Sequence, residues 1–506
     1  MAKLTALVAG AGPVGLTMAV ELARRGVSCR IVEKAGARTE LSKALVVWPR
    51  TMELLRFAGA DEAFLASGRK ITAARLYAGR RKLANIGFES VKTHYPFALF
   101  VPQSETERLL EEHLARLGVK VERAVELTDF TASAGGVTAN LRRADGKSES
   151  VAADYLLGCD GAHSIVRHKL GLTFDGVSEQ GVWMLGDVKL RNHPDPGELL
   201  MFWHGDGVLA IFPMREGRYR IIADWGKTAP PPSENVPATL DHIQGFLDRR
   251  GPGGIVAFDP AWLSFFRINE RKVKDYRKGR VFLVGDAAHI HSPAGGQGMN
   301  TGMQDAFNLG WKLALAAKGK SPEALLDSYA SERGMVGAMV LRNATRLTRI
   351  ATIRNRPGRM LRNVTAWLLM KLPKFRRLFA GAMTELDIAY PKSALSRGTQ
   401  GAPKGGPAPG DRAPDAELVL LGGGRARLFD AIDPGGFTFL SAGADETAGR
   451  ALAQRFAPAV KYLPCLPGGD YANGFYLIRP DGYVGLITAN GEYADVEKYL
   501  GNWLKG

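Results

Sequence analysis

The first residues whose spacing predicts chemistry form a glycine-rich turn near the N-terminus. The turn contains Gly10, Gly12, Pro13, Val14 and Gly15. It follows an apolar run at 4–9, which is typical of a buried parallel strand, and precedes a helical pattern that ends near Gly26. The first glycine permits a tight bend, the second lets the backbone approach a pyrophosphate, and the third lets helix and strand pack closely. Because a helix N-terminus also attracts anions, the pattern predicts a dinucleotide phosphate site.

A carboxylate follows this turn at the distance that such a site requires. The next predicted strand ends in Glu33, 18 residues after Gly15, where its side chain can accept hydrogen bonds from a ribose diol. We include the neighbouring Lys34 among the candidate cofactor-binding residues. The motif alone does not distinguish FAD from NAD.

A second glycine-rich segment lies about 285 residues after the first. The apolar run 281–285 predicts a buried strand, and Asp286 follows at its carboxyl end, where parallel α/β sheets place ligand-binding groups. A loop with Pro293, Gly295, Gly296 and Gly298 leads into a helix predicted from about 299 to 311. This helix N-terminus can face a ring system that becomes anionic on reduction.

The second segment also carries a family resemblance. Residues 280–312 resemble the GD motif of the class A flavoprotein monooxygenases, the aromatic hydroxylase family that includes phenol and p-hydroxybenzoate hydroxylases. Residues 159–167 resemble the DG motif of this family, and Gln103 and Glu107 resemble its segment between the first two motifs. The motifs are ordered and spaced as in the family over about residues 1–315. The resemblance implies FAD as the resident cofactor.

The resemblance also implies individual cofactor contacts. Asp286 would hydrogen-bond the ribityl chain of FAD, and Pro293 would lie over the reactive ring and act in catalysis. The backbone from Gly296 to Asn300 would donate hydrogen bonds to the flavin pyrimidine. The other expected contacts come from Lys43, Gln103, Asp160, Gly161, Arg167, Gly285, Gly298 and Met299. Lys43 stands where many relatives carry Arg, and the alternative for it is a solvated surface charge.

The chain contains one GxGxxG unit, whereas a two-dinucleotide reductase would show two. By resemblance, NAD(P)H then binds transiently, with NADPH favoured over NADH, and Asp160 and Arg167 would also serve the passing nucleotide.

Residues 181–267 have a different texture, with short aromatic runs separated by Gly, Pro and Asp, which predicts an antiparallel sheet. In the family such a sheet lies beneath the flavin and binds the substrate. The candidate substrate residues are Trp183, Met201, Trp203, Phe212 and Met214. Each of them has a core role as its alternative. A catalytic base for a phenol is predicted at His204 or His94, with Tyr219 also considered.

The resemblance implies an FAD-dependent monooxygenase that uses NAD(P)H and O₂ to hydroxylate a phenolic or polycyclic aromatic substrate through a flavin C4a-hydroperoxide. A polyketide-type polycyclic phenol is favoured over a simple phenol. One alternative is a Baeyer–Villiger oxygenase on the same scaffold. Another is a non-catalytic flavin-binding interaction protein. A Ser–His–Asp pattern, which would indicate a hydrolase, is not visible.

The expected fold class is α/β: a Rossmann-like FAD-binding domain with an inserted antiparallel substrate sheet and a C-terminal thioredoxin-like domain. The expected boundaries are 1–180 for the first FAD-binding part, with 70–97 contributing to the substrate domain; 181–267 for the substrate sheet; 268–395 for the second FAD-binding part and a helical extension; 396–414 for a linker; and 415–506 for the thioredoxin-like domain. Cys465 has no CxxC partner, so we expect a structural or dimerisation role for this domain.

Composition limits the other function classes. The 506 residues include three dispersed cysteines and no Cys/His cluster, so we expect no metal site and a cytoplasmic location. The net charge is +16, but residues 341–380 hold eleven Lys or Arg and no Asp or Glu. A nucleic-acid motif is absent, and no apolar run is long enough to span a membrane. For 341–380 we favour helices packed on the flavin domain with a solvated outward face over a membrane-surface or anionic-partner face, and we expect a break between the helices at Pro357-Gly358. The expected assembly is a monomer or homodimer.

Overall fold

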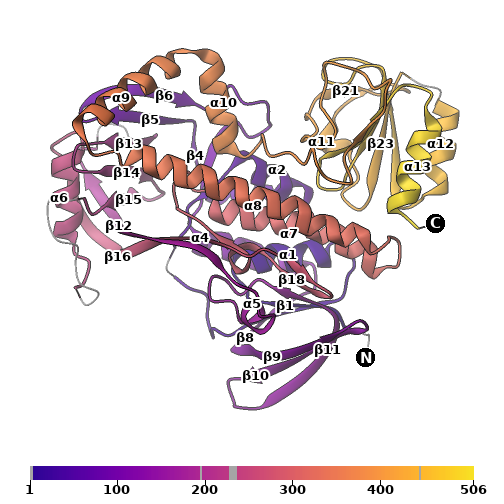
Figure 1. Ribbon diagram of the computed structural model, residues 1–506, viewed down its shortest axis with the longest axis horizontal. Helices are drawn as coiled ribbons and strands as arrows, with labels where there is room; N and C mark the ends of the chain where they lie inside the picture. The colour runs from indigo at the N-terminus through magenta and orange to yellow at the C-terminus, as the bar shows by residue number, and fades with distance from the viewer. Residues whose placement is uncertain (1–3, 41, 194–196, 227–235, 444–445, 506) are drawn as a thin grey trace.

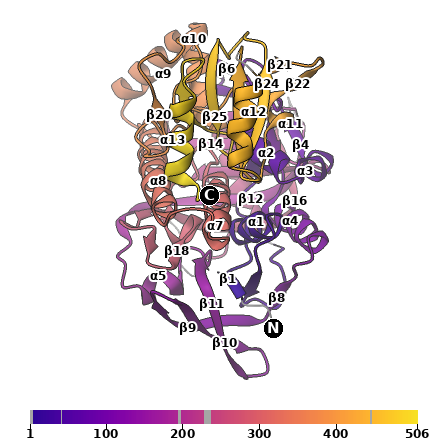
Figure 2. The same ribbon diagram turned by 90° about the vertical axis from the view of Figure 1, so that its right-hand side faces the viewer.

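The computed structural model describes residues 4–40, 42–193, 197–226, 236–443 and 446–505. Figure 1 shows the sheet that contains residues 175–272 at the left end of the longest axis and the C-terminal unit at the right, with long helices between them and the N-terminal sheet below these helices. A turned view places the C-terminal unit at the end opposite the hairpin of β9 (Val125–Ser133) and β10 (Gly136–Arg143) (Figure 2). The fold is mixed α/β, as the sequence predicts.

The first sheet carries the glycine-rich turn. Its strand order is β17 (Arg277–Lys278), β18 (Val281–Leu283), β11 (Ser148–Gly158), β1 (Leu4–Ala9), β2 (Cys29–Glu33) and β8 (Val121–Arg123). In addition, β10 (Gly136–Arg143) pairs with β11, and β9 (Val125–Ser133) pairs with β10. β1 pairs in parallel with β11 and β2. The helices around it are α1 (Pro13–Ala23), α4 (Gln103–Arg116), α5 (Ile165–Lys169) and α7 (Gly298–Ala317). Residues 6–9 are buried, which explains their apolar run.

The second sheet is almost wholly antiparallel. Its order is β19 (His289–Ile290), β16 (Val256–Lys272), β12 (Asp175–Arg191), β15 (Arg218–Asp224), β14 (Val208–Pro213), β13 (Leu199–Trp203), β5 (Ala73–Ala78) and β6 (Arg81–Gly87). Segment 70–97 therefore supplies two strands, and one of them, β5, pairs in parallel with β13. Helix α6 (Leu240–Arg250) covers one face, and the sequence pattern did not predict it.

A small three-stranded sheet and two helices stand between the large sheets. The sheet consists of β3 (Val46–Val47), β7 (Ala98–Phe100) and β4 (Arg69–Ile71), and the helices are α2 (Pro49–Phe57) and α3 (Asp61–Ser67). A single turn of 3-10 helix (Gly285–Ala287) follows β18.

The basic segment forms three helices: α8 (Ala324–Ala351), α9 (Arg356–Lys371) and α10 (Pro373–Thr384). The chain leaves helical geometry at 352–355, and Pro357 lies in the first turn of α9, so the predicted break at Pro357-Gly358 was wrong by a few residues. Proline suits this position because its missing N–H would be unpaired there anyway. Trp367 and Met370 of α9 pack on the substrate sheet next to β6, whereas the prediction placed the helices of 341–380 on the flavin domain. Only α8 packs on α7 as predicted.

The C-terminal unit is a five-stranded sheet of β20 (Arg397–Gly398), β26 (Val484–Thr488), β25 (Gly474–Ile478), β23 (Phe437–Ala442) and β24 (Val460–Cys465). Its other elements are β21 (Glu417–Val419), β22 (Arg425–Arg427), α11 (Leu428–Ala431), α12 (Glu446–Arg455) and α13 (Tyr493–Trp503). Segment 396–414, predicted to be a linker, contributes β20 and donates backbone hydrogen bonds from Gly410 to Val484 and from Ala413 to Gly482. It belongs structurally to the unit it precedes.

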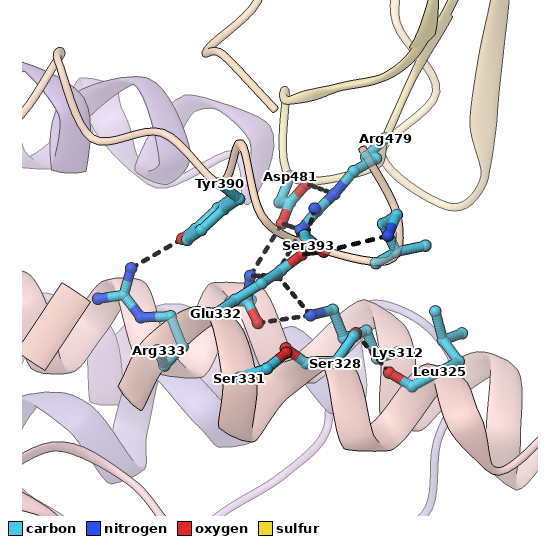
Figure 3. Close-up of polar contacts among 12 residues, drawn as sticks. Lys312, Leu325, Ser328, Ser331, Glu332, Arg333, Tyr390, Ser393, Arg479 and Asp481 are labelled. Carbon is cyan, nitrogen blue, oxygen red and sulfur yellow. Dashed lines mark hydrogen bonds and ion pairs between the residues drawn. The ribbon is translucent and has the colours of Figure 1, made fainter. Parts of the chain in front are cut away.

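A buried ionic cluster joins this unit to α7 and α8 (Figure 3). Arg479 contacts Glu332 at 2.6 Å and Asp481 at 2.6 Å, and Lys312 contacts Glu332 at 2.7 Å. Burial opposes ionisation of Glu332, but Arg479 and Lys312 outweigh it and hold the pKa of this carboxyl well below its usual value. Burial lowers the pKa of the Lys312 ammonium to about 8.

Candidate functional site

The glycine-rich turn has the steric properties that the sequence predicts. Gly10 has a φ of +97°, and a Cβ on it would lie 2.5 Å from the carbonyl oxygen of Cys159. A Cβ on Gly15 would lie 2.0 Å from the carbonyl oxygen of Gly10. A Cβ on Gly12 would have nothing within 4 Å. Gly10 and Gly15 are therefore required by the protein itself, whereas Gly12 borders an open space.

Glu33 lies against the same turn. Its two carboxylate oxygens accept hydrogen bonds from the backbone N–H groups of Ala11 at 2.8 Å and Ala35 at 3.0 Å. The half-buried carboxylate thus holds the turn and stays beside the open space at Gly12. The side chain of Lys34, the other candidate residue here, is exposed to solvent.

Two helix N-termini are free to bind an anion. Helix α1 starts after Gly12 and α7 starts after Gln297, and neither N-cap residue makes a side-chain capping bond. The first N–H groups of each helix are therefore available to an outside acceptor. Val14 packs between the two helices, because a Cβ on Gly285 or Gly302 would lie within 3 Å of its side chain.

Asp286 carries a carboxylate with no hydrogen-bond partner among the described residues. Its side chain is open to solvent, yet the surrounding protein raises the pKa of the carboxyl, and His289 and Lys43 act in the opposite direction. An exposed side chain whose pKa is nevertheless raised by the surrounding protein indicates that the Asp286 carboxylate lies in a recess that is open to solvent on one side. Such a carboxylate can accept hydrogen bonds from ligand hydroxyl groups.

Asp305 of α7 holds the backbone of the turn that carries Asp286, and the sequence analysis did not predict it. One oxygen accepts a hydrogen bond from the Gly285 backbone N–H at 3.0 Å and contacts His289 Nε2 at 2.8 Å. The other accepts from Arg333 at 2.5 Å. Burial alone would raise the pKa of Asp305, but Arg333 and His289 hold it below its usual value. Its position on α7, inside the recognised segment, was the available signal.

The loop before α7 is anchored by side chains that bind backbone. Asn300 accepts a hydrogen bond from the Trp48 N–H at 2.8 Å and donates to the carbonyls of Val46 and Gly296. The Trp48 indole donates to the Gly295 carbonyl at 3.0 Å. Pro293 is exposed at the tip of the loop, and its carbonyl accepts from Gly296. Gly298 and Met299 open the helix that follows.

His291 in this loop was also missed. Burial lowers the pKa of its imidazole to about 4, so the ring is neutral. Nδ1 lies 2.8 Å from the Ser292 carbonyl, whereas the buried Nε2 has no partner among the described residues and faces Gly298. An unpaired acceptor therefore lies beside the start of α7.

The DG segment contributes Asp160, Gly161 and Arg167. One oxygen of Asp160 accepts from the Val166 N–H at 3.1 Å, while the other is buried without a partner, and burial raises the pKa of this carboxyl. Gly161 takes a φ of +77°. Arg167 donates to the carbonyls of Ala287 and Ala162, and burial lowers its pKa. The Arg167 guanidinium therefore ties this segment to the Asp286 turn.

Lys43 lies on a segment that the second sheet holds, and Gln103, at the start of α4, contacts the same segment. Arg220 on β15 pairs with Asp187 and donates to the carbonyls of Ser42 and Lys43. Gln103 accepts from the Ala44 N–H and donates to Glu107. The Lys43 side chain is exposed. Arg220, which the sequence analysis missed, thus ties the second sheet to the segment that carries Lys43.

The predicted substrate residues share one face of the second sheet. Strand register places them on the side opposite α6: Trp183 on β12, Met201 and Trp203 on β13, and Phe212 and Met214 at the end of β14. Four of them, all except Trp183, pack in one cluster with Val46 and Trp48. Because Trp48 also holds the Gly295 carbonyl, this face adjoins the glycine loop.

The structure does not bring the two histidines to this junction. His204 follows β13 in the turn to β14, and its Nδ1 accepts from the Asp206 N–H. Burial lowers the pKa of His204. His94 is exposed, and its ring contacts Tyr95 edge-on.

These features fit an FAD molecule. The open side of Gly12, two uncapped helix N-termini, the unpaired Asp286 carboxylate and the unpartnered Asp160 oxygen lie on adjoining loops. Phosphates suit the helix N-termini, and ribityl or ribose hydroxyls suit the carboxylates.

The chain matches two family models. A model described as FAD binding domain matches residues 3–344, and one described as aromatic-ring hydroxylase, C-terminal, matches residues 406–505.

Known proteins similar to this chain carry related activities in their names. The 6-methylpretetramide 4-monooxygenase of Streptomyces rimosus is 36% identical over 94% of this chain and 89% of its own length. The pentachlorophenol 4-monooxygenase of Sphingobium chlorophenolicum is 32% identical over 96% of this chain and 93% of its own length. The solved anhydrotetracycline hydroxylase of Streptomyces rimosus superposes with a TM-score of 0.82, at 32% identity, over 99% of this chain and 98% of its own.

Proposed function

The chain belongs to the FAD-dependent aromatic-ring hydroxylases, monooxygenases of aromatic substrates, and we propose that its own substrate is a polycyclic phenol. The observation that carries this proposal is the broad apolar face formed by Met201, Trp203, Phe212 and Met214 beside the glycine loop, which Trp367 and Met370 of α9 cover on the side away from the sheet. Relatives that act on tetracycline-type polycycles support it, whereas the pentachlorophenol relative supports a simple phenol.

In this proposal the cofactor is held by the residues described above. The N-termini of α1 and α7 face its anionic groups, Asp286 and Glu33 accept from its hydroxyls, and Asn300 and Trp48 keep the loop at Gly296 in place. FAD, when bound, supplies the activation of O₂ and the transfer of one oxygen atom to the aromatic ring. The apolar sheet face orients the ring and excludes water.

We further propose that NADPH is the reductant and binds transiently, since the chain has one GxGxxG unit. The proton acceptor for the phenol is proposed to be His291, because its unpaired Nε2 lies beside the start of α7, whereas His204 and His94 lie away from this junction.

The C-terminal unit is proposed to be thioredoxin-like in fold without thiol chemistry. The strand order β26-β25-β23-β24, with β25 antiparallel to both neighbours and α12 joining β23 to β24, supports this. Burial raises the pKa of the Cys465 thiol to about 11, so it is protonated at neutral pH.

A turnover screen tests the substrate proposal. Anthraquinones and linear polycyclic phenols should stimulate NADPH oxidation and gain one oxygen, and product NMR should place it as a ring hydroxyl, not as a lactone. Stopped-flow reduction under nitrogen should accelerate about 100- to 1000-fold when the true substrate is bound. Turnover confined to single-ring phenols would contradict the polycyclic proposal.

A further inference from the structure

The outward face of helix α9 is apolar. Met360 is 72% exposed and Leu361 is 70% exposed, values expected of charged residues. The described residues contain twelve exposed large apolar side chains, and seven of these lie between 350 and 378. They are Ile350, Met360, Leu361, Val364, Leu368, Leu372 and Leu378.

The exposed residues form a continuous stripe. Positions 360, 364 and 368 recur every four residues, so their side chains lie above one another along α9, and Leu372 follows at its C-cap. The opposite face of α9 is already occupied, because Trp367 and Met370 pack with Met201 and Trp203 of the substrate sheet. A surface helix normally turns polar residues outward. The stripe is therefore an apolar surface that the monomer leaves uncovered.

Cations flank this stripe along the chain. Within 341–380, Arg354 pairs with Asp224, while Arg362 and Lys371 lie over the rings of Trp203 and Trp367. Arg354 and Arg359 are half-buried and Arg362 is buried. Besides Lys371, the exposed cations of the segment are Arg342, Arg346, Arg349, Arg356, Lys374, Arg376 and Arg377. The segment contains no Asp or Glu that could neutralise them. Helix α10 carries three of these cations beside the exposed Leu378.

We propose that α9 and α10 dock the protein on an anionic lipid surface. The stripe would enter the boundary between headgroups and acyl chains, and the flanking cations would lie against lipid phosphates. No helix in the described part of the chain is long and apolar enough to cross a membrane, so the contact is peripheral. The proposal goes beyond the enzymatic function and does not depend on the substrate.

Charge distinguishes this occupant from two others. A two-fold contact between copies would place the same cations of a chain with net charge +16 opposite each other, with no carboxylate in the segment to pair with them. A nucleic acid would neutralise the cations but would leave the stripe of Met, Leu and Val in contact with phosphates and water. Anionic lipid satisfies both components.

Vesicle sedimentation tests the proposal with the full-length, FAD-loaded protein. Vesicles of phosphatidylcholine containing about a third phosphatidylglycerol should bind the protein at least about tenfold more tightly than phosphatidylcholine alone. Raising the salt from about 0.05 M to about 0.5 M should weaken binding without abolishing it, because the apolar component is not screened.

Two variants separate the components, and each has a matched control. The pair Leu361→Gln and Leu368→Gln should lower binding at least about tenfold at both salt concentrations. The matched pair, Leu466→Gln and Val419→Gln, alters exposed apolar residues elsewhere and should bind as the parent does. The triple change Lys374→Gln, Arg376→Gln and Arg377→Gln should remove most of the preference for anionic lipid. Its control removes the exposed cations Lys120, Lys404 and Lys505.

Retained FAD and an unchanged melting temperature establish that each variant is folded. Absence of binding to anionic vesicles would overturn the proposal, as would equal binding by the parent and the Leu361/Leu368 variant. A concentration-dependent dimer that the same variant abolishes, without vesicle binding, would assign the face to a second copy instead.

Discussion

Asp286 and Asp305 have opposite roles, although both are carboxylates of the same turn. Asp305 is fully satisfied by the Gly285 N–H, His289 and Arg333, and it fixes the backbone. Asp286 has no partner among the described residues and faces the open side. Asp305 therefore determines where the Asp286 carboxylate lies, because it fixes the backbone at Gly285.

The first prediction concerns Asp286. The change Asp286→Ala deletes an acceptor for ligand hydroxyls worth about 1.5–3 kcal/mol, so FAD affinity should fall roughly tenfold to a hundredfold. Fluorescence titration of the FAD-free protein measures this. Asp175→Ala, which removes an exposed carboxylate at the start of β12, should leave the affinity unchanged. Wild-type affinity in Asp286→Ala would exclude the assigned contact.

Glu385 is a second buried carboxyl near α7, and its environment favours the protonated form. Burial raises its pKa to about 8, against hydrogen bonds donated by Thr301 and Gln304 that favour ionisation. The buried Oε1 of Gln304 has no hydrogen-bond partner among the described residues. If the amide oxygen and nitrogen of Gln304 are exchanged, a protonated Glu385 donates a hydrogen bond to this oxygen.

The second prediction follows from this pKa. The unfolded chain releases the Glu385 proton near pH 4.5 and the folded protein only near 8, so unfolding releases a proton in that window. This group's stabilisation is therefore complete below about pH 4.5 and declines towards pH 8, by at most about 1.4 kcal/mol per pH unit.

Denaturant unfolding at several pH values measures the effect. The change Glu385→Gln should be more stable relative to the parent at pH 8 than at pH 5, whereas Glu62→Gln on the surface should show no such difference. Parallel pH profiles for the parent and Glu385→Gln would show that Glu385 is ionised in the folded protein.

At the scale of elements, the junction of β1 and α1 contains one glycine that the fold requires and one that only the ligand requires. Gly15 is excluded from bearing a side chain by the Gly10 carbonyl, whereas Gly12 borders open space and has ordinary extended geometry with φ −73°.

The third prediction uses this separation. Gly12→Ala should fold with an unchanged melting temperature and lose FAD affinity at least about tenfold, because its methyl group enters the space for the pyrophosphate. Gly15→Ala should instead lower the stability of the protein itself, because the methyl group overpacks the contact of α1 with β1. Thermal unfolding and FAD titration of both variants, without added FAD and with it, distinguish these outcomes. Equal FAD affinity in Gly12→Ala and the parent would place the pyrophosphate elsewhere.

At the scale of the whole molecule, buried charges join the C-terminal unit to the rest. Arg479 in the turn after β25 reaches Glu332 on α8, and Arg333, the next residue along α8, contacts Tyr390 (Figure 3). Arg333 also donates to Asp305 of α7. Two adjacent residues of α8 therefore contact the C-terminal unit on one side and the support of the Asp286 turn on the other.

The fourth prediction is that this junction contributes strongly to stability. Arg479→Met leaves Glu332 and Asp481 buried with less compensation, which should cost about 3–5 kcal/mol in the free energy of unfolding. Arg425→Met breaks the exposed pair with Glu417 and should cost less than about 1 kcal/mol. Denaturant unfolding monitors both. Similar small losses would mean that the cluster does not hold the unit in place.

The sequence by itself determined the elements of the cofactor region and the family. The turn from Gly10 to Gly15, the strand ending at Asp286 and the helix after it are local features, because steric limits on the backbone act between neighbouring residues. The apolar face carrying Met201 and Phe212 was visible for the same reason, since strand alternation depends only on position.

Only the tertiary structure decided which side chains meet. Arg220 holds the Lys43 carbonyl across 177 positions, and Arg479 meets Glu332 across 147. Such partners depend on how whole elements pack, and no local spacing encodes them. The prediction of a solvated outward face for α9 was wrong for that reason. The sequence pattern of an amphipathic helix shows that one face is apolar. Only the packed molecule shows that α9 has a second apolar face and that this face stays exposed.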